Sequence, residues 1–202
     1  MSGMEIRPLL PEDYGPVSRM CARAFERDPV WRHLFPDSRR RPRQLAWIFE
    51  CWARIMGPMG TSYVAGDCVG TAMWFPPERG PHAGFAAQVA AGLWRAPWTL
   101  GPGFLWRGAR IQHDMNRLHR AELDSPCWIL DVLAVDPDCH RQGVGTALVG
   151  HMLERADRER TPCYVITHNP DNIAYYERHG FRLLHRAARG YLANSLRRGA
   201  PA

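Results

Sequence analysis

The residues with the clearest chemical potential form a strand, a turn and a helix between 128 and 157. The segment 128–135 is apolar except for Asp131, and Gly143-Val144-Gly145-Thr146 lies where the following helix is expected to begin. Glycine lets the backbone approach a ligand closely, and the free N–H groups of a first helical turn attract anions. This turn therefore predicts a phosphate or pyrophosphate site, although such a turn taken alone is a weak signal.

The composition excludes several other ways of holding a phosphate. All 26 basic residues are arginine, so the chain has neither the lysine of a phosphate-binding loop nor a Schiff-base lysine. A dinucleotide-binding fold is also disfavoured, because the next expected strand ends in Thr167-His168-Asn169-Pro170 rather than in an acidic residue. Any phosphate must be held by backbone N–H groups, by arginine or by hydroxyl groups.

A second motif follows that strand and makes the pattern specific. It reads Asn169-Pro170-Asp171-Asn172, then Tyr176 four residues before Gly180-Phe181. With His140-Arg141-Gln142-Gly143-Val144-Gly145, it resembles the GNAT N-acetyltransferases, whose signature is [QR]xxGxG[A/G] after a central strand, then Asn, then Tyr before Gly-Phe. The resemblance is strong over 125–186, extends to 5–75 through the order of elements, and hardly covers 80–122. His140 stands where the family has Gln or Arg.

The resemblance implies acetyl-CoA as the acyl-donor cosubstrate and a primary amine of a small molecule or peptide as the acceptor. The amine would attack the thioester directly in a ternary complex; the alternative is an acyl-CoA sensor of the same fold without turnover. The element order and the 169–181 motif look closest to the puromycin-type antibiotic acetyltransferases. The residues implied to bind the cofactor are Leu133, Ala134, Val135, Arg141, Gln142, Gly143, Val144, Gly145, Thr146, Asn169 and Asn172.

Two residues are candidates for proton transfer. Tyr176 matches the family's general acid, which protonates the leaving thiolate; otherwise it is a core tyrosine on an amphipathic helix. Asp131 interrupts an apolar strand, where a charge is costly unless it is paired or functional. It falls where similar proteins carry a glutamate base, so Asp131 is a candidate base or acceptor contact, or else a structural residue.

The elements that would position these residues follow one another without a linker or repeat. We expect helices near 13–25, 41–56, 140–157 and 172–179, and strands at 5–9, 61–65, 68–75, 128–135, 163–167, 181–184 and 190–192. Gly66-Asp67 indicates a hairpin. The prediction is one α+β acetyltransferase domain over 1–202, with its cofactor-binding core at about 125–186. By resemblance, its central sheet is mixed and mostly antiparallel, flanked by helices, with a helical insertion at about 80–122 before the central strand.

That insertion is rich in aromatic residues and is interpreted as core, or as a lid or wall over a pocket. An apolar or aromatic acceptor, its cationic amine attracted by π faces, would suit the large rings at 74–106. A plain core would explain them equally well. These residues are Trp74, Phe75, Trp94, Trp98 and Trp106.

Charge and cysteine content bear on partners and location. The net charge is +6, but the 20 acidic residues are spread along the chain and the basic run 39–43 reads as a solvated loop or helix start, so no nucleic-acid partner is expected. The most apolar stretch, 80–94, is too short to span a bilayer and ends at Arg95, so no membrane partner is expected either.

The six cysteines have neither metal-ligand nor CxxC spacing, which indicates free thiols, a cytoplasmic location and no metal. Pro8, Pro11, Glu12 and Asp13 interrupt any signal-peptide pattern. We expect a monomer or a homodimer.

Overall fold

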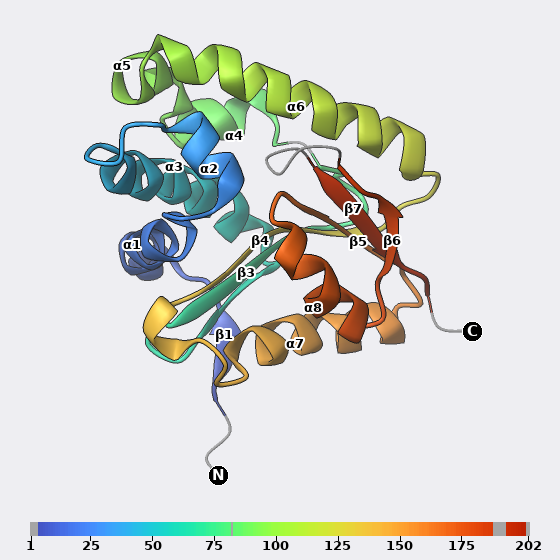
Figure 1. Cartoon of the computed structure of the whole chain (residues 1–202). Coiled ribbons are helices and arrows are strands. Elements are labelled where there is room, and N and C mark those ends of the chain that lie inside the picture. The colour runs from blue at the N-terminus through green and yellow to red at the C-terminus, as the bar shows by residue number, and fades with distance from the viewer. Residues whose placement is uncertain (1–3, 82, 188–192, 201–202) are drawn as a thin grey trace.

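The structure is a computed structural model of the chain, and it describes residues 4–81, 83–187 and 193–200 (Figure 1). Over these residues the strands form one seven-stranded sheet in the order β1-β2-β3-β4-β5-β7-β6. Only β4 and β5 pair in parallel, so the expected mixed, mostly antiparallel sheet is confirmed. The strands are β1 Ile6–Pro8, β2 Ser62–Ala65, β3 Gly70–Phe75, β4 Trp128–Val135, β5 Cys163–Thr167, β6 Arg182–His185 and β7 Asn194–Arg198.

Helices cover both faces of the sheet, and a separate buried cluster fills each interface. On one face lie α1 Tyr14–Phe25, α2 Pro29–Leu34 and α3 Arg41–Met56, extended by α4 Phe85–Ala90, α5 Ala96–Leu100 and α6 Pro102–Glu122. On the other lie α7 Val144–Arg158 and α8 Ile173–Arg178 (Figure 1). Short 3-10 turns are η1 Pro11–Asp13, η2 Gly57–Met59, η3 Leu93–Arg95, η4 Pro137–Cys139 and η5 Pro170–Asn172.

The structure confirms most of the expected elements, corrects two expectations and adds two elements. Helix α7 begins at Val144 rather than at residue 140, because Arg141 (φ 62°) and Gly143 (φ 82°) have left-handed backbone conformations that interrupt a helix. Helix α2 and strand β7 were not predicted, and the strand expected at 190–192 lies outside the described residues. The basic run does start a helix, α3, but Arg41 is buried and donates to the carbonyls of Phe35, Pro36 and Glu26.

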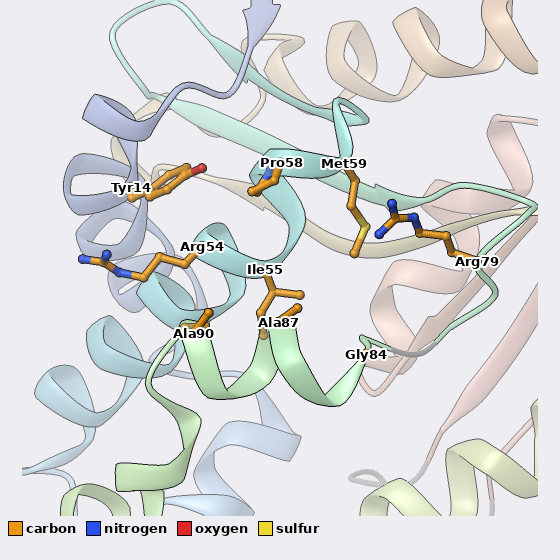
Figure 2. A pocket seen from close by; sticks show the side chains of 10 residues that line it. Tyr14, Arg54, Ile55, Pro58, Met59, Arg79, Gly84, Ala87 and Ala90 are labelled. Carbon is orange, nitrogen blue, oxygen red and sulfur yellow. The ribbon is translucent and has the colours of Figure 1, made fainter.

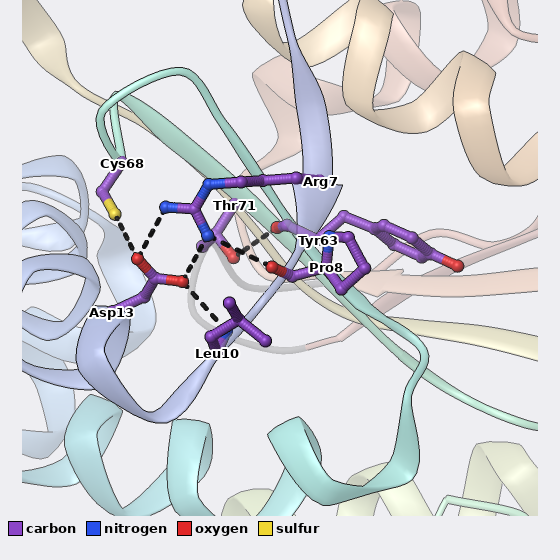
Figure 3. A network of polar contacts seen from close by, with 7 residues as sticks. All are labelled: Arg7, Pro8, Leu10, Asp13, Tyr63, Cys68 and Thr71. Atoms are coloured by element: carbon purple, nitrogen blue, oxygen red, sulfur yellow. Dashed lines mark hydrogen bonds and ion pairs between the residues drawn. The ribbon is translucent and has the colours of Figure 1, made fainter.

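A polar network ties β1 to the first helix and to the β2–β3 turn (Figure 3). The Arg7 guanidinium binds both carboxylate oxygens of Asp13, at 2.6 and 2.7 Å, and the Leu10 amide donates to one of them at 2.9 Å. The Cys68 thiol donates to the other oxygen at 3.4 Å. The Arg7 hydrogen bonds lower the pKa of Asp13 to about 2, so this pairing holds the corner across the neutral range.

Candidate active site

The site begins where the two central strands part. The parallel register of β4 with β5 runs from Trp128 opposite Cys163 to Leu130 opposite Val165. Beyond that point β5 continues with β7, and β4 continues with β3, up to Val135. On the side that faces β5, the backbone of residues 131–135 is therefore not paired with a neighbouring strand, although it lies in the middle of the sheet. Its N–H and C=O groups on that side need another hydrogen-bond partner. An extended polar chain could supply one, which is the role expected for Leu133, Ala134 and Val135.

A β-bulge lies at the same place. Met73 of β3 pairs with Val132 and the next residue, Trp74, pairs with Leu130, so Asp131 has no partner residue on β3. The extra residue shifts the alternation of side chains: Ile129 before it and Val132 after it both pack into the cluster under α1 and α3. Asp131 points to this same face, because its carboxylate meets a side chain of α3.

That side chain is Trp52, whose indole Nε1–H donates to Asp131 Oδ2 at 2.5 Å. Asp131 is half-buried. Burial raises its pKa to about 6, and the hydrogen bond from Trp52 works in the opposite direction. A carboxylate with a pKa near 6 is ionised at neutral pH and is a stronger base than an exposed aspartate, so it can accept a proton from a bound group.

The turn between β4 and α7 is shaped to expose backbone N–H groups. The Asp136 carboxylate accepts from the Asp138 amide at 3.1 Å and is paired with Arg23, and the Gln142 side chain donates to the Asp138 carbonyl at 3.2 Å. Gly143 then takes a left-handed conformation as the N-cap of α7. The first intrahelical bond runs from the Ala147 amide to the Gly143 carbonyl.

The backbone amides that precede Ala147 in α7 consequently have no carbonyl of their own helix to bind. They belong to Val144, Gly145 and Thr146, all predicted cofactor-binding residues. Arg141 and Gln142 are exposed beside them, whereas the Val144 side chain is buried against β3. This helix end can hold an anion through its backbone, with Arg141 as the nearby cation.

Tyr175 was missed by the sequence analysis and lies over this helix end. A Cβ at Gly145 would lie 3.1 Å from the Tyr175 hydroxyl and 3.5 Å from Val135, so glycine allows α8 to approach α7. Burial raises the pKa of Tyr175 to about 12, and its buried hydroxyl has no hydrogen-bond partner among the described residues. The only sequence signal was its position next to Tyr176 in the same motif.

Tyr176 occupies a different environment on the same helix. Its side chain is 5 % exposed and packs in the cluster between the sheet and α7, with its ring 5.8 Å from that of Phe181. Burial raises the pKa of Tyr176 well above its ordinary value, and the charges of Tyr175 and Asp28 add to the effect. The phenol therefore keeps its proton at neutral pH and could act only as a donor.

Asp28 is a further residue that the sequence analysis missed. Its carboxylate caps the unpredicted helix α2 by accepting from the Val30 amide at 3.0 Å, and burial raises its pKa. It contributes a negative charge that acts on Tyr176 from the opposite helical layer. Its N-cap position before Pro29 was the available signal for α2.

The two asparagines of the second motif shape the turn between β5 and α8. The Asn169 side chain accepts from the Asp171 amide at 3.1 Å, and the Asn172 amide group donates to the Thr167 hydroxyl at 3.3 Å. Both predicted cofactor-binding side chains are thus engaged within their own turn. Their local contribution is to present α8 at the end of β5.

A cavity among the described residues lies elsewhere, between α3 and α4 (Figure 2). It has a volume of about 660 Å³ and includes Tyr14, Arg54, Ile55, Met59, Arg79 and Ala87 among its lining residues. None of the predicted site residues lines it. In the described part of the chain, no group of His, Cys, Asp and Glu is arranged to hold a metal ion, and no helix is long and apolar enough to cross a membrane.

Comparison with known proteins agrees with this geometry. The family model described as "Acetyltransferase (GNAT) family" matches residues 23–181. A Corynebacterium glutamicum protein described as histone acetyltransferase HPA2 and related acetyltransferase is similar in structure, with a TM-score of 0.67, 19% identity, and coverage of 98% of this chain and 97% of the other.

Two further solved structures have the same fold at low identity. PaiA N-acetyltransferase from Thermoplasma acidophilum, in complex with coenzyme A, gives a TM-score of 0.58 at 11% identity and covers 98% of this chain and 99% of its own. The ribosomal-protein-S18-alanine N-acetyltransferase from Escherichia coli gives 0.55 at 17% identity, covering 98% and 96%.

Proposed function

The chain belongs to the GNAT acetyltransferase family, and from that premise we propose that it moves the acetyl group of acetyl-CoA to a primary amine of a small molecule or peptide. It is an acyltransferase by family and fold. The proposed reaction is direct attack of the amine on the thioester while both substrates are bound. The observation that carries the proposal is the coincidence, within β4 and the turn after it, of a split in the sheet, a bulged carboxylate and an exposed helix N-terminus.

The donor fits the groups that this chain presents. The pyrophosphate of acetyl-CoA would bind the amides of Val144, Gly145 and Thr146, with Arg141 supplying positive charge. The pantetheine arm carries amide groups, and these would pair with the β5-facing backbone edge of residues 133–135, where the Val135 carbonyl already lies 3.2 Å from the His140 Nε2. A Thermoplasma acidophilum neighbour of the same fold was solved with coenzyme A, which supports this assignment.

Asp131 is the proposed general base. An amine reaches the site as an ammonium ion, so it must lose a proton before its nitrogen lone pair can attack the thioester carbon. Asp131, held by Trp52 and partly exposed, would accept that proton directly or through a water molecule. The new C–N bond then forms, the nitrogen gives up its second proton to solvent, and the C–S bond of the tetrahedral intermediate breaks to release coenzyme A as a thiolate.

Tyr176 is the proposed general acid for that thiolate. Burial keeps the phenol protonated, and because its raised pKa also makes it a weaker acid than a thiol, proton transfer requires that acetyl-CoA binding lower that pKa. We expect Tyr176→Phe to lower kcat by about tenfold to a hundredfold, with the Kd of acetyl-CoA unchanged. Tyr175→Phe is the matched control and should leave kcat near the wild-type value. If Tyr175→Phe removes activity and Tyr176→Phe does not, the acid is Tyr175.

The overall proposal is tested by two measurements on the same protein. Acetyl-CoA should raise the melting temperature, and a screen of amines, including amine-bearing antibiotics, should find acceptors that release free thiol. A thermal shift without thiol release from any amine would support the alternative of an acyl-CoA sensor. Absence of a thermal shift would contradict the donor assignment itself.

The five aromatic residues that would suit an apolar or aromatic acceptor divide into two groups by exposure. Trp74 and Phe75 are buried in the core. Trp94, Trp98 and Trp106 are exposed, and none of the five lines the cavity in Figure 2.

A further inference from the structure

The inserted helices carry an unusual amount of exposed apolar surface. Of the nine large hydrophobic residues that are exposed among the described residues, six lie in 85–106. They are Phe85, Val89, Trp94, Trp98, Leu105 and Trp106, which together are called the insertion surface below. Phe85 is 82 % exposed and Trp98 is 78 % exposed, whereas such rings are ordinarily buried. Exposed apolar residues gathered in this way indicate a surface that another body covers.

Helix α4 is the part of the insertion surface with the least burial. Its sequence, FAAQVA, is uncharged, and none of its residues is buried. Phe85 and Val89 are four residues apart and so share one face of the helix. The rings of Trp94 and Trp98 contact each other at 6.4 Å between centroids and form an exposed aromatic pair just beyond α4. A helix of six residues gains little stability by itself, so burial against another body would stabilise it.

The charge of the insertion indicates which kind of partner would cover this surface. No acidic residue occurs between Glu78 and Asp114, although the chain has 20 of them. Arg95 and Arg110 are exposed within this run, and the Arg110 guanidinium lies 5.6 Å from the centre of the Trp106 ring. A second copy of this chain would bring an equally acid-free segment across a symmetric contact and would leave these arginines without carboxylate partners. An anionic surface, in contrast, complements them.

We propose that the insertion surface docks on an anionic lipid bilayer. Tryptophan and phenylalanine rings favour the headgroup region, and arginine pairs with lipid phosphates. Docking is peripheral, because no described helix is long and apolar enough to cross the bilayer. The apolar stretch 80–94 is too short for a membrane span, and peripheral docking departs from the expectation of no membrane partner. It does not depend on the acetyl-transfer proposal.

Vesicle flotation tests the inference with the intact chain. Vesicles of phosphatidylcholine alone are compared with vesicles of phosphatidylcholine and phosphatidylglycerol, at low and high salt. We expect flotation with the anionic vesicles, accompanied by a blue shift of tryptophan emission. Binding to the neutral vesicles should be weaker than binding to the anionic vesicles by about tenfold or more. High salt should weaken binding to the anionic vesicles, because it screens the attraction between arginine and phosphate.

Matched variants separate the apolar and the charged contributions. The double variant Phe85→Ser and Trp98→Ser should lose at least about tenfold in binding, whereas Leu184→Ser, which removes an exposed leucine of β6, should bind like the wild type. Arg95→Gln should weaken binding about fivefold, and the exposed Arg39→Gln should not. All of these side chains are exposed, so circular dichroism should show unchanged folding.

Three outcomes would overturn the inference. The first is no flotation with anionic vesicles, and the second is flotation that the double variant leaves unchanged. The third comes from sedimentation: a wild-type dimer that becomes a monomer in the double variant would show that a second copy covers this surface. None of these readouts uses acetyl-CoA, so their failure is separate from failure of the proposed enzyme activity.

Discussion

The segment from Trp128 to Arg158 and the inserted helices from Phe85 to Glu122 present their functional groups in opposite ways. In β4 and α7, the groups proposed to bind the donor are mainly backbone atoms, exposed by a split between strands and a left-handed glycine. In α4, η3 and α5, the backbone is regular and the side chains are exposed. Substitution should therefore affect acyl transfer in the first region and surface association in the second.

The largest effect expected in the first region is that of Asp131→Asn. Asparagine keeps the size of the side chain and can still accept a hydrogen bond from Trp52, but it cannot take up a proton. We expect kcat/KM to fall by about a hundredfold to a thousandfold at neutral pH, with the Kd of acetyl-CoA unchanged. Steady-state kinetics and a binding titration measure the two quantities. Asp28→Asn is the comparison, and an equal loss there would show that the site needs negative charge rather than this base.

The same variant should change the pH dependence of stability. The pKa of Asp131 is about 6 in the folded chain and 3.8 ordinarily. The unfolded chain therefore loses this proton at lower pH than the folded chain, so the free energy of unfolding falls as the pH rises from about 4 to about 6. Asp131→Asn should therefore have a higher melting temperature than the wild type near pH 8. The difference should shrink as the pH falls through about 6 and vanish below about 4. A wild type that is more stable than the variant at pH 8 would contradict the raised pKa.

A smaller effect is expected from Gly143→Ala. Gly143 has a φ of 82°, and a side chain there introduces backbone strain of about 1–2 kcal/mol at the turn that presents the helix amides. We expect the Kd of acetyl-CoA to rise about tenfold, as measured by calorimetry. Gly150→Ala, in the middle of α7 with open space around its Cβ, is the control. It should bind normally and unfold at a slightly higher temperature.

Trp52→Phe should shift the pH profile of kcat/KM rather than abolish the activity. The Trp52 hydrogen bond lowers the pKa of Asp131, so its removal should raise that pKa above about 6. The acidic limb of the kcat/KM profile should move to higher pH by about half a unit to one unit. Activity at pH 8 to 9 should recover most of the wild-type value. Trp47→Phe, on the same helix, should leave the profile in place, and a uniform loss at every pH in Trp52→Phe would indicate a merely structural role.

The smallest effect expected on catalysis comes from the inserted helices. Trp98→Ser should change kcat/KM in vesicle-free solution by less than about twofold, because this ring contacts Trp94 and is otherwise exposed. A large loss in that assay would remove the contrast between the two regions, since it would place Trp98 at the acceptor.

The sequence predicts β4 and the elements that pack near it better than it predicts the inserted helices. Strands β4 and β5 and helix α3 have the predicted bounds, because their apolar patterns are long and end at Asp136-Pro137, Gly57-Pro58 or an equivalent signal. The turn motif locates the start of the helix that follows, but only to within four residues, since Gly143 caps a helix that begins at Val144. The left-handed conformation of Arg141 gives no local signal.

The parts that were missed depend on contacts between distant residues. The hydrogen bond from Trp52 to Asp131 joins positions 79 residues apart, and no periodicity in either segment indicates it. Arg41 looked like one of several solvated arginines, yet its three backbone acceptors lie up to 15 residues away. The insertion was expected to be core, lid or wall, and the exposure of its rings follows from packing that the sequence pattern does not fix.

The bulge at Asp131 also has a consequence for the strand itself. If this one residue were deleted, Leu130 would be followed by Val132, and β4 would alternate regularly between its two faces, with Met73 and Trp74 of β3 opposite consecutive residues. Every core side chain would keep its face. The carboxylate is thus an addition to a strand that is already complete without it. If Asp131 is the base, as proposed, deletion of this single residue removes the base and leaves the packing of the strand intact.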